Sequence, residues 1–196
     1  MDKLSYSLGV TVGANLKQQE FKLENVDDFI SGLRNVIENK KLEIDEKEVN
    51  EIVNEYFKEI QEKVANQQAE IQANFFAENG KKEDIITTES GLQYKVIKEG
   101  EGAMPAAEDN VSVHYHGTLL DGKVFDSSVD RGEPVTFPVN GVIKGWQEAI
   151  QLMKEGGKLL IFVPSELAYG AQGAGNVIPP HTPLAFEVEL IKIIKE

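Results

Sequence analysis

The residues that make turns are confined to one part of this 196-residue chain. All seven prolines lie at or beyond Pro105, and 13 of the 17 glycines lie beyond Gly80. Glycine and proline punctuate turns and interrupt helices, so a stretch without them favours helices and a stretch rich in them favours short strands. The chain is therefore predicted to be helical up to about residue 80 and turn-rich β structure after it.

Two helix patterns occupy the first 40 residues. Gly9 and Gly13 lie beside an apolar row that recurs every four positions, formed by Leu4, Leu8, Val12 and Leu16. Each interior glycine costs a helix about 1 kcal/mol relative to alanine, so close approach of another backbone explains this pair better than helix propensity does. The alternative is a helix that frays at its glycines. Asn25 is predicted to cap a second helix that ends near Asn39.

A third helix is predicted from Asp45, a candidate N-cap with Glu48 three residues on, to the stop at Asn79–Gly80. Its roughly 34 residues would span on the order of 50 Å. The polar segment 65–69 in its second half is expected to be solvated, which makes this helix an extended arm. Since the remaining helices offer only a small core, we expect two copies to share one core in a homodimer formed through residues 1–64.

Residues beyond 90 show the alternation of strands. Apolar residues alternate with polar ones near 92–96, 111–115, 135–139, 160–162 and 184–190, and helical spacing is confined to Lys144–Met153. The predicted fold class is α+β: an all-α dimerisation domain with a long connecting helix, followed by an antiparallel half-barrel sheet wrapped around one short helix. The expected domains are residues 1–80, a linker at 81–90 with β structure starting after it, and residues 91–196.

Charge and composition exclude several functional classes. Residues 1–80 carry 16 acidic and 9 basic side chains (net −7) and residues 81–196 carry 17 and 11 (net −6), which gives the total of −13. Nucleic acids and anionic membrane surfaces require clustered lysine and arginine, so neither is expected as a partner. With no cysteine, the chain has no disulfide framework, thiolate nucleophile or cysteine-based metal site.

The N-terminus lacks the apolar core and cleavage site of a signal peptide, and no apolar run approaches the ~18 residues that span a bilayer. We therefore expect a soluble, cytoplasmic protein. The alternative is a periplasmic protein whose signal peptide has been removed and replaced by a methionine.

Tyr115, four short motifs and Phe186 follow one another in the β segment, within the roughly 75 residues from Val111 to Phe186. The four motifs are Val124-Phe125-Asp126-Ser127-Ser128, Val142-Ile143-Lys144-Gly145-Trp146, Ala168-Tyr169-Gly170 and Val177-Ile178-Pro179-Pro180. In this order they resemble the FKBP family of peptidyl-prolyl cis-trans isomerases, over roughly residues 88–196. Aromatic residues on strands are otherwise most often plain core, and the ordered match is what favours a pocket.

The resemblance implies a place for each residue. Trp146 would form the pocket floor beneath the proline ring, Tyr169 would donate its hydroxyl to a substrate carbonyl, and Ile178 would offer its backbone N–H at the rim. Asp126 would pair with Arg131 in an orienting and electrostatic role, without acting as an acid or base. The walls and further substrate contacts would be Tyr115, Phe125, Phe137, Val142, Ile143, Val177 and Phe186.

The resemblance implies an enzyme without a cofactor that isomerises X–Pro bonds in unfolded or partly folded polypeptides and assists folding. A second hypothesis is a chaperone-like dimer whose pocket anchors prolines while turnover is incidental. The opening residues 4–9 and the arm also resemble the N-terminal dimerisation domain of bacterial macrophage infectivity potentiator (Mip)-like FKBPs. Rim positions Val135, Ala174 and the short loop 139–141 depart from the family pattern. This leaves open the preferred residue before proline and whether tacrolimus or rapamycin inhibits the protein.

Two histidines are candidate metal ligands. His114 and His116 share one face of a predicted strand, but no third ligand lies near them in the sequence. We therefore expect no metal. The family pattern at this place predicts that His114 is a structural hydrogen-bonding residue and that His116 lies at the surface.

Overall fold

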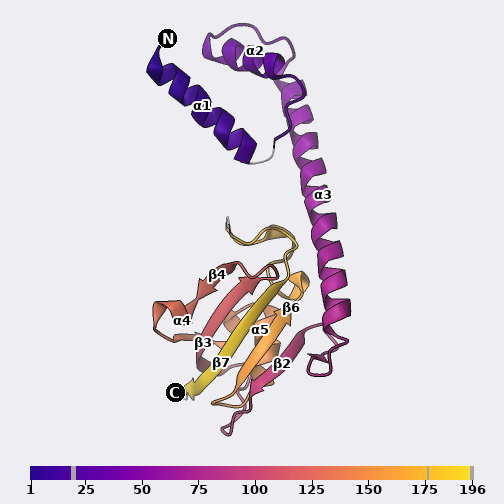
Figure 1. The fold of residues 1–196 in the computed structure, drawn as a ribbon, viewed down its shortest axis with the longest axis vertical. Helices are drawn as coiled ribbons and strands as arrows, with labels where there is room; N and C mark the ends of the chain where they lie inside the picture. Colours follow the sequence, from indigo (N-terminus) through magenta and orange to yellow (C-terminus); the bar gives the residue numbers. More distant parts are fainter. Residues whose placement is uncertain (19–20, 176, 195–196) are drawn as a thin grey trace. The chain divides into compact units, whose positions relative to one another are not determined.

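The structure is a computed structural model that describes residues 1–18, 21–175 and 177–194. It comprises two compact units, residues 1–57 and residues 58–196. The three predicted helices are present as α1 (Lys3–Gln18), α2 (Val26–Ile37) and α3 (Glu46–Asn79) (Figure 1). Both predicted caps are confirmed.

Each cap satisfies backbone donors that the first helical turn leaves without a partner. The Asn25 side chain accepts hydrogen bonds from the backbone N–H groups of Asp27 (3.0 Å) and Asp28 (3.3 Å). The Asp45 carboxylate accepts one from Glu48 N–H at 2.8 Å. These local signals explain why α2 and α3 begin where the sequence predicts.

One antiparallel sheet forms the second unit, and its strands follow the order β1-β2-β6-β7-β3-β4, with β5 also paired to β3. The predicted α+β class is confirmed. The helix α5 lies against one face of this sheet (Figure 1). The elements are β1 (Ile86–Thr87), β2 (Gln93–Lys98), β3 (Asn110–Leu119), β4 (Val124–Ser127), α4 (Ser128–Arg131), β5 (Val135–Pro138), η1 (Val139–Gly141), α5 (Lys144–Gln151), β6 (Lys158–Val163), η2 (Ser165–Leu167), η3 (Gly170–Gln172) and β7 (Leu184–Ile194).

The core lies between α5 and the concave face of the sheet. Trp146, Ile150 and Met153 are buried, as their helical spacing predicts. Residues 159, 161 and 163 of β6 are buried while their neighbours are half-exposed, so the alternation seen in the sequence marks the core face. Gly145 permits the close approach of α5 to β6, because a Cβ at this position would overlap Val163 Cγ1.

The structure differs from the sequence prediction in the segment 81–90. This segment contains β1, whose Ile86 pairs with Tyr94 and whose Thr87 pairs with Gln93, so the prediction that β structure begins only after residue 90 is wrong. Two residues are too few to show alternation. The four-residue elements β4 and α4 were also not predicted as separate elements.

The unit boundary also differs from the expected one at residue 80. Residues 58–79 of α3 belong with the sheet unit, where the Phe75 ring packs on Phe162 with centroids 5.3 Å apart. Asn79 is buried and donates a hydrogen bond to Gln93 at 2.9 Å, and Gln93 donates to the carbonyl of Phe76 at 2.9 Å. The end of the arm is therefore part of the second unit.

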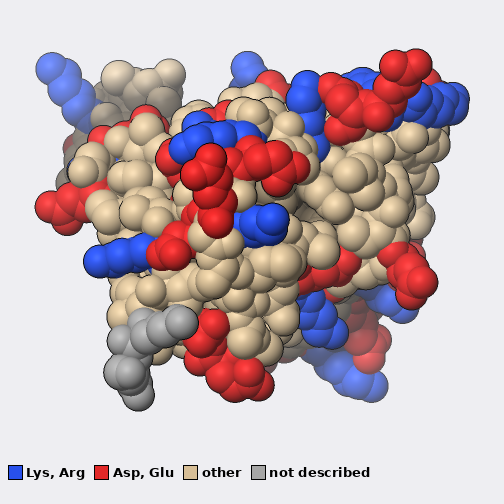
Figure 2. All heavy atoms as spheres, turned by 90° about the horizontal axis from the view of Figure 1, so that it is seen from below, with Lys and Arg blue, Asp and Glu red and all other residues tan. Residues whose placement is uncertain are grey.

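Surface charge is mixed on the face that Figure 2 shows, where lysine and arginine side chains stand among aspartate and glutamate. A mixed distribution does not create the extended positive potential that attracts polyanions. Among the described residues, no helix combines the length and the apolar character that a membrane crossing requires.

Replacing Gly145 by alanine is expected to lower the free energy of unfolding, because the overlap of the added Cβ with Val163 costs about 1–3 kcal/mol. The about 1 kcal/mol that alanine gains in a helix offsets part of this cost, which leaves a net loss of up to about 2 kcal/mol. Gly32→Ala in α2 is the matched control, since its Cβ would meet nothing within 4 Å and should not destabilise. Urea denaturation followed by circular dichroism measures both. Wild-type stability in Gly145→Ala would contradict the close packing of α5 on β6.

Candidate active site

A cavity of about 340 Å³ opens between the sheet and the start of α5. Residues from β3, β4, β5, β7, the η1–α5 connection and the segment after η2 converge on it, so segments distant in the sequence build one site. Aromatic and apolar side chains dominate its surface. The lining residues are Tyr115, Phe125, Asp126, Val135, Phe137, Gly141, Val142, Ile143, Trp146, Tyr169 and Phe186.

Trp146 is the centre of the aromatic lining. The centre of its ring lies 5.2 Å from that of Tyr115 and 5.1 Å from that of Phe186, and both pairs are edge to face. The Phe137 ring is tilted, with its centre 5.6 Å away. Edge-to-face contacts of this kind are favourable beyond the area they bury. Among the described residues the buried indole N–H of Trp146 has no hydrogen-bond partner.

Gly117 on β3 allows two of these rings to approach the strand. A Cβ there would lie 2.8 Å from Phe125 Cζ and 2.9 Å from Phe186 Cε1. The two rings themselves meet edge to face at 5.4 Å. Any side chain at residue 117 would displace them, so a glycine is required for the shape of this wall.

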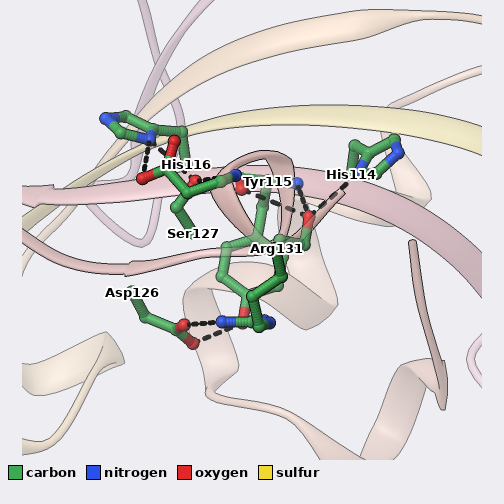
Figure 3. A network of polar contacts seen from close by, with 8 residues as sticks. His114, Tyr115, His116, Asp126, Ser127 and Arg131 are labelled. Atoms are coloured by element: carbon green, nitrogen blue, oxygen red, sulfur yellow. Dashed lines mark hydrogen bonds and ion pairs between the residues drawn. The ribbon is translucent and has the colours of Figure 1, made fainter. Parts of the chain in front are cut away.

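Three polar groups form a network at one side of the cavity (Figure 3). The Tyr115 hydroxyl and the Arg131 guanidinium both donate hydrogen bonds to the Asp126 carboxylate, one to each oxygen. Arg131 also donates to the Tyr115 hydroxyl at 3.0 Å, and its guanidinium carbon lies 5.7 Å from the centre of the Tyr115 ring. The carboxylate is therefore held in place on both oxygens.

Two serines attach the short helix α4, which carries Arg131, to strand β3. Buried Ser128 accepts a hydrogen bond from Tyr115 N–H (2.8 Å) and contacts His114 Nδ1 (3.0 Å). Ser127 caps α4 by accepting from Asp130 N–H at 3.1 Å and contacts His116 Nδ1 at 2.9 Å (Figure 3). Both serines belong to the Val124–Ser128 motif, but nothing in the sequence predicts this attachment.

The pKa values of the cavity residues fit a role without proton transfer. Burial opposes ionisation of Asp126, but the hydrogen bonds from Tyr115 and Arg131 outweigh it and lower the pKa of this carboxyl. Burial raises the pKa of Tyr115, and its hydrogen bond to Asp126 adds to the effect. Asp126 is therefore an anion and Tyr115 a neutral donor near neutral pH.

Tyr169 presents a phenol to the cavity. Burial raises its pKa, and the nearby charge of Asp126 raises it further, so its hydroxyl keeps its proton near neutral pH. Among the described residues this hydroxyl has no hydrogen-bond partner, and the residue is 40% exposed. It is a donor that remains available to a bound molecule.

Most of the predicted site residues meet at the cavity, but three do not line it. Arg131 contacts it only through Asp126 and Tyr115, Val177 is exposed, and Ile178 is buried in the core. The backbone N–H of Ile178, expected at the rim, donates to the carbonyl of Ala174 at 3.1 Å in this structure. The lining residues Val135 and Gly141 were not among the predicted site residues.

The two histidines lie behind the cavity. His114 is a structural hydrogen-bonding residue, as expected, whereas His116 is half-buried and engaged by Ser127, so its description as a surface residue is incomplete. Within the described ranges, no group of three or more histidine, cysteine, aspartate or glutamate side chains is arranged to hold a metal.

Known families and structures match both parts of the chain. The family model for FKBP-type peptidyl-prolyl cis-trans isomerase matches residues 101–191, and the model for the domain amino terminal to it matches residues 1–96. The FKBP-type 22 kDa peptidyl-prolyl cis-trans isomerase of Escherichia coli is 45% identical over 97% of this chain and 94% of its own length.

Two further relatives extend the match. The peptidyl-prolyl cis-trans isomerase Mip of Coxiella burnetii is 41% identical over 100% of this chain and 87% of its own length. The crystal structure of FkpA from Escherichia coli superposes with a TM-score of 0.79 at 35% identity, covering 97% of this chain and 92% of that one.

Asp126 is expected to titrate below about 3.9, the ordinary value for aspartate. A lowered folded pKa stabilises the fold above the unfolded value, and this contribution is lost as the pH falls through the folded pKa. The difference in unfolding free energy between wild type and Asp126→Asn should be constant from about pH 7 to about pH 5 and shrink below about pH 4. Carboxyl carbon NMR and urea denaturation measure these quantities, and titration of Asp126 at or above its ordinary value would contradict the network.

Proposed function

Because this chain belongs to the FKBP-type peptidyl-prolyl cis-trans isomerases, we propose that its cavity accelerates X–Pro rotation by holding the amide in an aromatic, water-poor site where Tyr169 donates to a substrate carbonyl. The chain is an isomerase of polypeptides, and rotation about this bond neither makes nor breaks a covalent bond. The ring-lined cavity around Trp146 is the observation that carries the mechanism.

The chemistry requires a preference for the twisted amide over the planar one. The planar form is stabilised by resonance, with a barrier of about 18–20 kcal/mol to rotation. Water stabilises this more dipolar planar form, so a cavity that removes water destabilises it relative to the twisted form. An acceleration of about 10⁶-fold requires only about 8 kcal/mol of such preference.

The polar groups of the site supply orientation. Both oxygens of Asp126 already accept hydrogen bonds, from Tyr115 and Arg131, which leaves the carboxylate a fixed negative charge at the cavity wall. Tyr169 lies across the same cavity with its hydroxyl protonated. A substrate carbonyl that turns during rotation can therefore accept from Tyr169 while the carboxylate favours the positive end of the amide dipole.

Removing only the Tyr169 hydroxyl, in Tyr169→Phe, is expected to lower kcat/KM for a Xaa-Pro tetrapeptide about tenfold or more, because the donor acts on the rotating amide. Asp126→Asn should show a comparable loss. Tyr94→Phe is the matched control, because Tyr94 packs at the core outside the cavity and its substitution should leave the rate unchanged. Full activity of Tyr169→Phe in a protease-coupled assay would remove the donor from the mechanism.

The same variants separate isomerisation from client binding. If the pocket also anchors unfolded chains, Tyr169→Phe should still suppress aggregation of a denatured client at wild-type levels, because the ring-lined wall is intact.

We further propose that two copies associate through residues 1–64. None of the described residues within 1–57 is buried in a single chain. The apolar row of α1 is largely exposed, with Leu4 at 69%, Leu8 at 59% and Val12 at 42%. A unit of this size that buries so little apolar surface has too small a core to be stable alone.

The exposed surface is shaped to receive another chain. Within this unit a groove of about 760 Å³ is lined by α1 and α2 residues such as Val12, Leu16, Phe29 and Leu33. A Cβ built on Gly9 or Gly13 would meet nothing within 4 Å, so no backbone among the described residues of this chain makes the close approach expected there. A second copy of α1 and α2 supplies both the missing apolar contacts and that backbone.

Sedimentation equilibrium of the full chain is expected to give twice 21.7 kDa. Val12→Glu should shift the mass toward 21.7 kDa by placing a charge in the groove, while tetrapeptide isomerisation is retained. Ser7→Glu, on α1 but not among the residues that line the groove, is the control and should remain dimeric. A wild-type mass of 21.7 kDa would rule out the dimer.

A further inference from the structure

The last turns of α3 are fastened to the isomerase sheet within the unit 58–196. One apolar contact and one buried amide pair do this: the Phe75 ring against Phe162, and Asn79 against Gln93. Asn79 and Gln93 are only 2% and 3% exposed. A buried amide pair that satisfies its own groups fixes one arrangement, because any other leaves polar atoms without partners.

Gln72, one turn before Phe75, makes a second polar attachment. Its side-chain oxygen accepts a hydrogen bond from the backbone N–H of Ser165 at 2.7 Å. Its side-chain nitrogen donates to the Glu166 carboxylate, at 3.0 Å to one oxygen and 3.3 Å to the other. One side chain thus uses both ends of its amide on two successive residues of η2.

This contact replaces a helix cap that the local sequence does not provide. The residue at the cap position of η2 is Pro164, which makes no side-chain hydrogen bond to the turn. The first N–H groups of a helical turn have no partner within it, and Ser165 is only 2% exposed, so its N–H needs an acceptor from elsewhere. Gln72 supplies that acceptor from a residue 93 positions away in the sequence.

The turn that Gln72 holds leads directly into the active site. Tyr169, the proposed donor, follows η2 by two residues and lines the cavity. Leu167 and Ala168 pack on the core between them. The carbonyl of Leu167 also lies 3.4 Å from where a Cβ of Gly145 would be, so the same turn abuts the start of the helix that carries Trp146.

We propose that Gln72 is a positioning residue of the isomerase site: by holding Ser165 and Glu166 it fixes the segment that aims the Tyr169 hydroxyl at the rotating amide. The proposal rests on the donor role of Tyr169 given above. The end of α3 then contributes to catalysis, because a hydrogen bond weakens steeply when its donor moves. A displaced Tyr169 hydroxyl would therefore no longer stabilise the twisted amide.

Gln72→Ala in the full chain is expected to lower kcat for a Xaa-Pro tetrapeptide about tenfold while KM changes little, because misplacement of a donor acts on the transition state. Gln67→Ala is the matched control: it removes the same side chain from an exposed position of the same helix and should leave kcat unchanged. Fluorescence of Trp146, the only tryptophan, confirms that each variant is folded. Wild-type kcat in folded Gln72→Ala would overturn the proposal.

Exchanging the amide of Gln72 and the carboxylate of Glu166 tests their contact directly. A double variant that restores the contact should recover activity, whereas two changes that each only lower stability would not. Gln72→Glu keeps the acceptor for Ser165 N–H but brings a second carboxylate against Glu166, so it should also lose activity. Adding Glu166→Gln restores a donor opposite the new carboxylate, and the double variant should recover most of the wild-type kcat. A double variant as inactive as Gln72→Glu alone would overturn the proposal, even if Gln72→Ala fails to fold.

The path through Tyr169 is tested by combining variants. In a Tyr169→Phe background, Gln72→Ala should cause no further loss, because the group it positions is absent. If Gln72→Ala lowers kcat in the Tyr169→Phe background by the same factor as in the wild type, Gln72 does not act through Tyr169. A fully active Tyr169→Phe would refute the donor role itself, whereas an impaired Tyr169→Phe beside a fully active Gln72→Ala would refute only the positioning role.

Discussion

The contact between Trp146 and the rings of Tyr115, Phe137 and Phe186 is the interaction on which the rest of this structure depends. Trp146 is 5% exposed and belongs to the core that joins α5 to the sheet, yet the same ring borders the cavity. Core packing and site packing are therefore one set of contacts. The walls of the aromatic pocket are the inner face of the sheet, so the contacts that stabilise the fold also shape the site.

The polar groups around Asp126 keep its carboxylate ionised in an apolar cavity. A carboxylate at the wall of an apolar site loses hydration, which by itself favours the neutral acid. Tyr115 and Arg131 reverse this by donating to both oxygens of Asp126, and the serines at 127 and 128 hold the helix and strand that carry these donors. The charge is kept ionised and immobile, which suits an electrostatic role and does not suit a proton carrier.

Local sequence signals predicted the elements and most of the lining, because periodicity, caps and ordered motifs each depend on near neighbours. The caps Asn25 and Asp45 and the buried row of α5 are examples. The features that the sequence did not predict depend on partners farther along the chain. Strand β1 exists only through its pairing with β2. The bond from Gln72 to Ser165 joins residues 93 positions apart and has no local signature.

The two units differ in how much of their stability a single chain can supply. The unit 58–196 has a full core, from Leu92 to Leu190, whereas the described residues of 1–57 bury none of their apolar side chains. In the proposed dimer, association of the helical units depends on protein concentration, whereas the core of the unit 58–196 lies within one chain. The helix α3 has residues in both units, and its end belongs to the unit with the full core. Dissociation of the proposed dimer would therefore leave Gln72, Phe75 and Asn79 within the unit that contains the site.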